Sequence, residues 1–128
     1  MTNRIAYAPE GTEWMEKDFG MSPAIRAGDL VWLSGVVVSP QEGQSLEDAI
    51  DTTFSKIALT LKEAELSWND VVDVSSFHVD LAPQKELFLK VKSRYITQKP
   101  YPSWTAIEVK GLWGDALVAE IKVVASAA

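Results

Sequence analysis

Apolar residues recur at three- and four-residue steps between Ser45 and about Leu66, the clearest periodic pattern in the chain. Such spacing gathers apolar side chains into one stripe of a helix. Ser45 stands where a helix cap belongs, and the acidic Glu47 and Asp48 suit the positive end of the helix dipole. The pattern predicts a helix over 45–66 with an apolar stripe of Leu46, Ala49, Ile50, Thr53, Phe54, Ile57, Ala58, Leu61 and Ala64.

Two runs of apolar, β-branched residues, at 30–38 and 117–125, follow a different pattern. Runs of that length are typical of strands covered on both faces. Gly35 inside the first run indicates a bulge or a close approach by another group. Shorter runs predict further strands at 23–26, 71–79 and 104–109.

A second helix is expected after Asp80, which can cap it, with Pro83 in the first turn, where a missing N–H costs little. The segment 99–102 ends this helix because residues before proline avoid helical geometry. Its apolar stripe consists of Leu87, Phe88, Val91 and Tyr95. The first twenty residues have no clear period.

The resulting order is strand, strand, helix, strand, helix, strand, strand. It suits one α+β domain over 1–128, with both helices on one face of a mixed sheet. Because the two long strands are apolar at both alternate positions, the second face must also be covered. Assembly into an oligomer would cover it.

Composition removes several functional classes. The chain has no cysteine, which excludes disulfides, thiolate metal sites and cysteine nucleophiles. Its single histidine excludes a site built on several histidines, and no P-loop or G-x-G-x-x-G motif occurs. The net charge of -6 argues against nucleic-acid binding, and no run reaches the length of a membrane span. We therefore expect a cytoplasmic protein without a phosphate cradle or dinucleotide site and without a nucleic-acid or membrane partner.

Three residues are candidates for chemistry, each with a simpler alternative. Glu120 interrupts an apolar strand; buried, it would suit proton transfer, whereas an exposed position beside Lys122 would be structural. Trp104 begins a strand and either packs or stacks on a ligand. His78 is either a structural residue or lines a pocket.

Four segments together resemble the reactive-intermediate deaminase (Rid) family, also known by its member YjgF. They are AIRAGDLVWLSG at 24–35, the stretch 46–80, YPSWTAIEV at 101–109 and LVAEIKVVA at 117–125. The chain is similar in particular to the YjgH-like branch, which also carries an SFH-D element and a YP-x-WTA element.

This resemblance implies a chorismate-mutase-like fold in a homotrimer, with the sheets forming a central barrel and ligands bound in clefts between subunits. Family deaminases hydrolyse enamines and imines such as 2-iminobutanoate and 2-iminopropanoate, so the resemblance implies no metal and no cofactor. In them, an arginine after the Y-P-x element binds the substrate carboxylate, and a glutamate in the last strand positions the attacking water.

Carried onto this chain, the resemblance assigns Glu120 as the water-positioning glutamate and Ser34 and Gly35 as the S-G of the pocket. Thr105 and Ala106 also belong to the implied ligand site, with backbone amides near Ala106 holding the ligand. Trp104 stands where the arginine should be. In addition, Val36 replaces the usual glutamine, and Ala106 replaces a frequent cysteine.

An indole offers one N–H and a flat apolar face instead of a bidentate fork, so the pocket should favour an aromatic, apolar or cationic ligand. Lys122 or Arg26 would be alternative sources of positive charge. The first hypothesis is an imine or enamine hydrolase of altered substrate preference. The alternative is a non-catalytic metabolite-binding protein using the same cleft. An endoribonuclease, an older family label, fits the acidic charge least.

Overall fold

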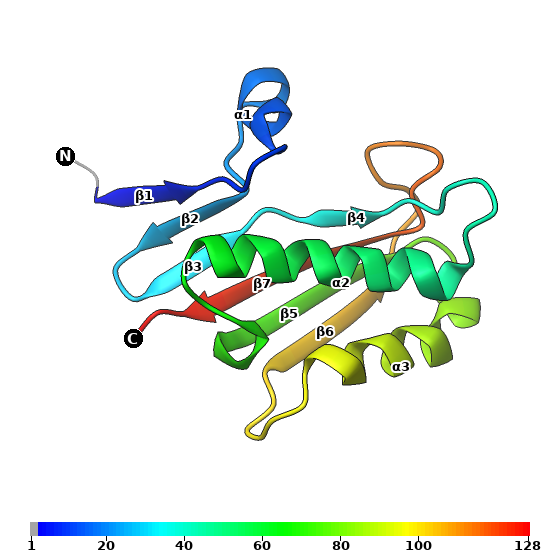
Figure 1. Cartoon of the computed structure of the whole chain (residues 1–128). Helices are drawn as coiled ribbons and strands as arrows, with labels where there is room; N and C mark the ends of the chain where they lie inside the picture. Colours follow the sequence, from blue (N-terminus) through cyan, green and yellow to red (C-terminus); the bar gives the residue numbers. More distant parts are fainter. Residues whose placement is uncertain (1–2) are drawn as a thin grey trace.

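Across residues 3–128, which the computed structural model describes, seven strands form one mixed sheet (Figure 1). Met1 and Thr2, included in the predicted domain, lie outside the described residues. The strands are β1 (Arg4–Tyr7), β2 (Ala24–Ala27), β3 (Leu30–Leu33), β4 (Val36–Val38), β5 (Val71–His78), β6 (Ser103–Glu108) and β7 (Ala119–Ser126). The helices are α1 (Glu13–Phe19), α2 (Leu46–Glu63) and α3 (Lys85–Tyr95), with short 3-10 turns η1 (Trp68–Asp70) and η2 (Ala82–Gln84).

The strand order is β1-β2-β3-β7-β5-β6, and β4 also pairs with β7. Only β5 and β6 run parallel among these pairs; the others are antiparallel. Helices α2 and α3 lie side by side on one face of the sheet (Figure 1). The predicted α+β class, with two helices on one face of a mixed sheet, is therefore confirmed.

Strand β7 shows how the sheet is divided. Ala119, Ile121, Val123 and Ala125 are fully buried, whereas the residues between them are only half-buried. Alternate side chains of a strand point to opposite faces. One face of β7 therefore packs into the core beneath α2 and α3, and the other carries Glu120 and Lys122 away from these helices.

Helix α2 forms as predicted because its cap and its apolar stripe agree. Ser45 Oγ accepts a hydrogen bond from the Asp48 backbone N–H at 3.1 Å. Ile50, Phe54, Ile57 and Leu61 along the stripe are fully buried.

The predicted bulge at Gly35 is also confirmed. Strands β3 and β4 both pair with β7, but the register changes between them, so residues 33–35 oppose only residues 122–123. An extra residue of this kind bends the strand and leaves part of the ladder unpaired. The interruption divides the predicted strand at 30–38 into two.

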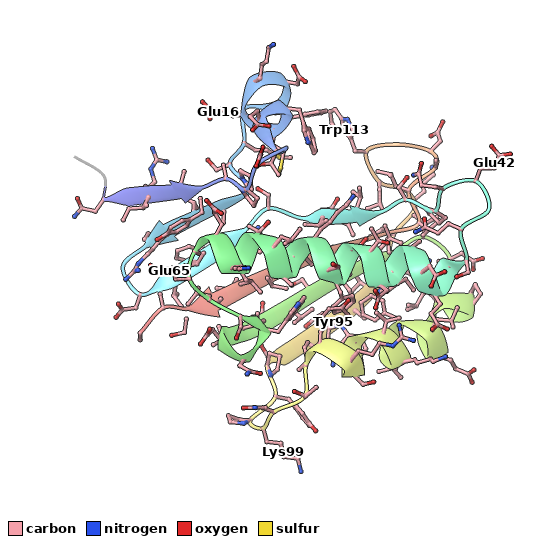
Figure 2. The ribbon with its side chains drawn as sticks, in the orientation of Figure 1. Glu16, Glu42, Glu65, Tyr95, Lys99 and Trp113 are labelled. Atoms are coloured by element: carbon pink, nitrogen blue, oxygen red, sulfur yellow. The ribbon has the colours of Figure 1, made fainter. Side chains whose placement is uncertain are left out.

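The N-terminal region and the start of α3 differ from expectation. Strand β1 and helix α1 were not predicted, and Asp80 does not cap a helix, since it has a left-handed φ of 60°. Instead, Glu108 Oε1 accepts a hydrogen bond from the Leu81 N–H at 2.9 Å. Figure 2 shows Trp113, from the loop before β7, pointing toward α1, where its ring lies 6.0 Å from Phe19.

Within residues 3–128, every helix is too short or too polar to cross a membrane.

Candidate ligand-binding site

A mainly apolar pocket of about 300 Å³ opens between α3 and the edge formed by β5 and β6. Two of the predicted ligand-binding residues, Trp104 and Ala106, line it, and so does His78. Since β6 is the last strand of the sheet, its helix-facing side chains can reach such an opening. The pocket is lined by His78, Leu81, Lys85, Phe88, Leu89, Trp104 and Ala106.

Trp104 is both a packing residue and a wall of this pocket. Its ring stacks on Phe88, with centroids 5.9 Å apart and an interplanar angle of 18°. Lys92 Nζ lies 4.5 Å from the centroid of the same ring, a cation–π contact. Burial in this position lowers the pKa of Lys92. The two interpretations left open for Trp104 are therefore compatible.

His78 lies at the floor of the pocket, with an exposed fraction of 0%. Its Nδ1 lies 2.8 Å from Gln84 Oε1, and its Nε2 lies 2.8 Å from Ser76 Oγ. Trp104 Nε1 donates to the same Ser76 Oγ at 2.9 Å. The one histidine of the chain is thus part of a buried network that reaches the pocket wall.

Lys85 is the residue that sequence reasoning missed. Among residues 3–128, it alone brings a full charge to the pocket lining. It stands on the exposed first turn of α3, so its ammonium group can reach an anion in the opening. The signal was its spacing three residues before Phe88, which makes the two side chains neighbours on the surface of α3.

Glu120 lies on the opposite face of the sheet from Trp104. Glu120 pairs with Phe77 across β5 and β7, whereas Trp104 pairs with Val74 across β5 and β6. Val74 is fully buried beneath the helices, and Phe77 belongs to the alternate set of side chains. Within one chain, the predicted catalytic carboxylate and the tryptophan therefore do not meet.

Thr105 shares the face of Glu120, because it pairs with Ser75, which in turn pairs with Lys122. The predicted site residues thus divide into two groups. Trp104 and Ala106 belong to the pocket beside α3, and Glu120 and Thr105 belong to the face without helices.

Gly35 and Glu120 are brought together. A Cβ atom on residue 35 would lie 2.7 Å from Glu120 Cδ, so the carboxylate occupies the space that a side chain would need. The neighbouring Ser34 is already engaged, since its Oγ donates to the Ser22 carbonyl at 2.6 Å. Among residues 3–128, no three His, Cys, Asp or Glu side chains gather as a metal site would require.

Neither of the alternative cations considered from the sequence lines the pocket. Lys122 Nζ donates to the Leu33 carbonyl at 2.9 Å, where the bulge leaves that oxygen accessible. Arg26 Nε donates to the Gly28 carbonyl at 2.9 Å within its own turn. The positive charge over the Trp104 ring comes instead from Lys92 on α3.

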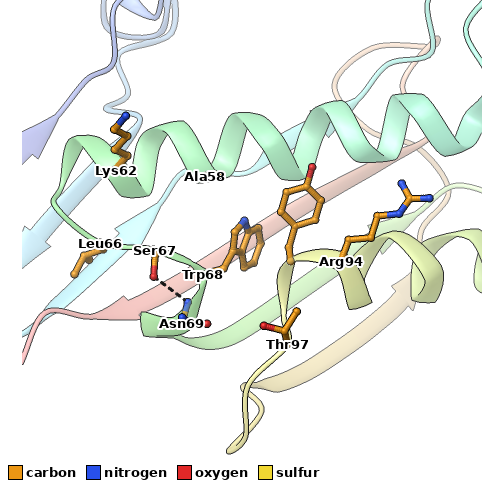
Figure 3. Close-up of a pocket in the computed structure, with 9 residues that line it drawn as sticks. Ala58, Lys62, Leu66, Ser67, Trp68, Asn69, Arg94 and Thr97 are labelled. Carbon is orange, nitrogen blue, oxygen red and sulfur yellow. Dashed lines mark hydrogen bonds between the residues drawn. The ribbon is translucent and has the colours of Figure 1, made fainter.

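A larger but shallower depression, about 440 Å³, lies where α2, η1 and α3 approach one another (Figure 3). Its two aromatic residues serve the core: Trp68 stacks on Phe54 and donates to the Phe54 carbonyl, and Tyr95 also stacks on Phe54. None of the predicted site residues lies there. This depression is larger than the pocket beside α3, but only the smaller pocket contains predicted ligand-binding residues. We therefore take the smaller pocket as the candidate site.

Comparison with known proteins places the chain among relatives of the same fold. A family model described as endoribonuclease L-PSP matches residues 16–127. The chain is 36% identical to the RutC family protein YjgH of Escherichia coli (strain K12), over 98% of this chain and 96% of that protein.

Two solved structures are similar over nearly their whole lengths. The structure of protein YJGH has a TM-score of 0.84 and 34% identity, covering 98% of this chain and 97% of that one. That of Rv2704 from Mycobacterium tuberculosis, a member of the YjgF/YER057c/UK114 family, has a TM-score of 0.81 and 24% identity, covering 97% and 99%. With a family model that matches most of the chain and a relative similar throughout, this protein belongs to the Rid (YjgF) family.

Proposed function

We propose that this protein is an imine or enamine hydrolase of the Rid family that acts on substrates with a large apolar or aromatic group. The observation that carries the proposal is the pocket beside α3, where Trp104 and Ala106 meet Lys85 in a mainly apolar lining. Such a pocket buries a planar apolar body, and the lysine gives one fixed attraction for an anion.

The same lining defines the expected substrate class. A small 2-imino acid such as 2-iminobutanoate or 2-iminopropanoate would leave much of the 300 Å³ unfilled and would lack the bidentate arginine. An aromatic 2-imino acid would stack on Trp104 and Phe88, with its carboxylate directed to Lys85. We therefore expect aromatic substrates to be preferred over the small ones.

The water-positioning role proposed for Glu120 requires a second copy of the chain. Glu120 lies against Gly35 on the face without helices, away from the pocket of its own chain. In a homotrimer with its clefts between subunits, as the family resemblance implies, Glu120 of one chain would approach the pocket of the next. There the carboxylate would accept a proton as water attacks the imine carbon, and ammonia would leave.

A second candidate, a non-catalytic metabolite-binding protein using the same cleft, is favoured by one observation. Trp104 replaces the arginine, and its indole N–H is already bonded to Ser76, so this residue offers no free polar group to a substrate. Binding by stacking would then persist without turnover. RNA cleavage is not proposed, because the net charge is -6.

The deciding experiment measures imine hydrolysis by the purified protein. Amino-acid oxidase would generate imines from phenylalanine, leucine and alanine, with semicarbazide competing for each intermediate. We expect faster release of the 2-oxo acid, most for phenylalanine, and a loss of about 100-fold or more in Glu120→Gln. Glu42→Gln, an exposed loop change, is the matched control.

Mixing two inactive variants tests the intersubunit site. In assemblies of Glu120→Gln with Lys85→Glu chains, some clefts would join an intact Glu120 to an intact Lys85, so activity should return. No gain on mixing would contradict a shared site.

The alternative function is tested by binding. If no imine is hydrolysed but phenylpyruvate binds, and Lys85→Gln weakens that binding while Lys62→Gln does not, the binding function replaces the enzymatic one.

A further inference from the structure

Beneath the candidate pocket lies a buried polar cluster of Ser76, His78 and Gln84, with exposed fractions of 0%, 0% and 3%. Burying polar groups is costly unless each finds a hydrogen-bond partner. Among residues 3–128, every buried side-chain nitrogen and oxygen has one. The cluster is therefore satisfied internally, and its hydrogen bonds have a direction that can be worked out.

Gln84 sets that direction. Its Nε2 lies 2.7 Å from the Val79 carbonyl and 3.0 Å from the Val118 carbonyl. Two carbonyl oxygens require the amide NH₂ between them, so Oε1 must face His78. Because Oε1 can only accept, His78 Nδ1 must carry a proton and donate across the 2.8 Å separation.

The remaining bonds follow from the imidazole. With Nδ1 protonated in the neutral ring, Nε2 accepts from the Ser76 hydroxyl at 2.8 Å. The lone pairs of Ser76 Oγ then accept the indole N–H of Trp104 at 2.9 Å. One directed chain therefore runs from Trp104 through Ser76 and His78 to Gln84, and ends on two backbone carbonyls.

The Ser76–His78–Gln84 distances resemble those of a nucleophile, a base and an orienting group. The hydroxyl is nevertheless inaccessible, and Trp104 occupies the side from which a substrate would approach it. The cluster therefore acts through Trp104. His78 also contacts the second aromatic wall, since its ring meets Phe88 edge-on with centroids 4.8 Å apart.

We propose that Ser76, His78 and Gln84 are positioning residues that fix the Trp104 indole in the wall of the ligand pocket. A held ring presents a stacking surface without the entropy cost of ordering it on binding. The benefit to ligands rests on the proposed function. The hydrogen-bond chain itself does not, and can be tested without a ligand.

Nuclear magnetic resonance of the intact protein provides that test. The indole N–H resonance of Trp104, assigned by its absence in Trp104→Phe, should exchange slowly with solvent. The ring nitrogen shifts of His78 should show a neutral imidazole protonated at Nδ1. Rapid exchange of the Trp104 N–H would overturn the proposal. A proton on Nε2 would overturn it even if no variant folds, because His78 is the one histidine of the chain and needs no variant for its assignment.

A graded series at Ser76 tests the coupling. Ser76→Ala removes the indole acceptor, so the Trp104 resonance should shift and exchange faster, while Ser76→Cys, a weaker partner, should be intermediate. Ser75→Ala, on the opposite face, is the control.

Phenylpyruvate should bind Ser76→Ala about tenfold more weakly. An unchanged Trp104 resonance in folded Ser76→Ala would refute the relay. If that resonance moves while wild-type protein binds no phenylpyruvate, the relay stands and the ligand proposal fails.

Discussion

The contact between Gly35 and Glu120 shows how one residue without a side chain can serve another. Glu120 Cδ lies in the space where a Cβ on residue 35 would be, and no other glycine of residues 3–128 has a neighbour that close. Gly35 does not have a positive φ, so its backbone would tolerate other residues. Glycine is required here because the Glu120 carboxylate occupies the space that a side chain would need.

Gly35→Ala should therefore impair function more than folding. The added methyl group would displace the end of a flexible, half-buried side chain, which costs little stability but moves the proposed water-positioning carboxylate. A misplacement of about 1 Å can cost about 100-fold in rate. We expect imine hydrolysis to fall by at least about tenfold, with an unfolding temperature within a few degrees of wild type.

Gly111→Ala is the matched control, because a Cβ there meets nothing within 4 Å and its φ is not positive. It should leave both hydrolysis and stability unchanged. A Gly35→Ala protein with full activity would show that the position of Glu120 does not limit the reaction.

At the scale of secondary structure, the sequence predicted those elements that are stabilised by residues close together in the chain. Ser45 caps α2 through a neighbour three residues away, and the bulge at Gly35 follows from a glycine inside an apolar run. The predicted cap of α3 was wrong: no side chain of residues 3–128 caps this helix, and the carboxylate that accepts from the Leu81 N–H ahead of it, Glu108, is 27 residues distant. Strand β1 lay beyond the pattern because three of its four residues are exposed at the sheet edge.

The candidate site was predicted only in part for a related reason. Trp104 and Ala106 could be identified as pocket residues by resemblance, but the sheet register that separates Trp104 from Glu120 depends on pairing with β5 and β7. The bond from Lys122 to the Leu33 carbonyl joins residues 89 positions apart. No local periodicity carries such information.

Helices α2 and α3 are joined at the surface by a cluster of ion pairs. Glu47 pairs with Arg94 and, at 3.1 Å, with Lys90, while Asp51 pairs with Arg94 at 3.2 Å. Tyr95 lies between the two helices nearby (Figure 2). The hydrogen bond from Arg94, followed by that from Lys90, holds the pKa of Glu47 below its ordinary value of 4.5.

This lowered pKa predicts how stability depends on pH. The charged form of Glu47 stabilises the folded state above pH 4.5, and the contribution disappears as the pH falls through the lower folded-state pKa. Glu47→Gln should therefore unfold at a slightly lower temperature near neutral pH, by about a few degrees at most, because the pairs are at the surface. Calorimetry across the acid range should show the two proteins converging as the pH falls.

Glu63→Gln, at the other end of α2, changes a carboxylate that forms no ion pair within residues 3–128 and should follow wild type at every pH. If the unfolding temperatures of Glu47→Gln and wild type differed by the same amount down to the lowest pH, the difference would come from packing and not from the charge of Glu47.

For the whole molecule, the face of the sheet without α2 and α3 is the most informative surface. Paired residues Val37, Glu120, Phe77 and Ile107 form one row across β4, β7, β5 and β6. Three of these four are apolar, and Ile107 is 45% exposed in a single chain. A mostly apolar row around a carboxylate suits a surface that another copy of the chain covers, which is where the predicted barrel of a homotrimer would form.

Ile107→Asp should prevent that assembly. A charge buried against another apolar surface without a partner is strongly unfavourable. If wild type forms the expected trimer in light scattering, the variant should remain monomeric at the same concentration. Leu59→Asp provides the contrast, because Leu59 is 58% exposed on α2, an element on the opposite face. It should keep the oligomeric state of wild type. If Ile107→Asp assembles normally, or Leu59→Asp alone dissociates, the oligomer forms through another surface, and Glu120 of one chain would no longer be expected to reach the pocket of the next.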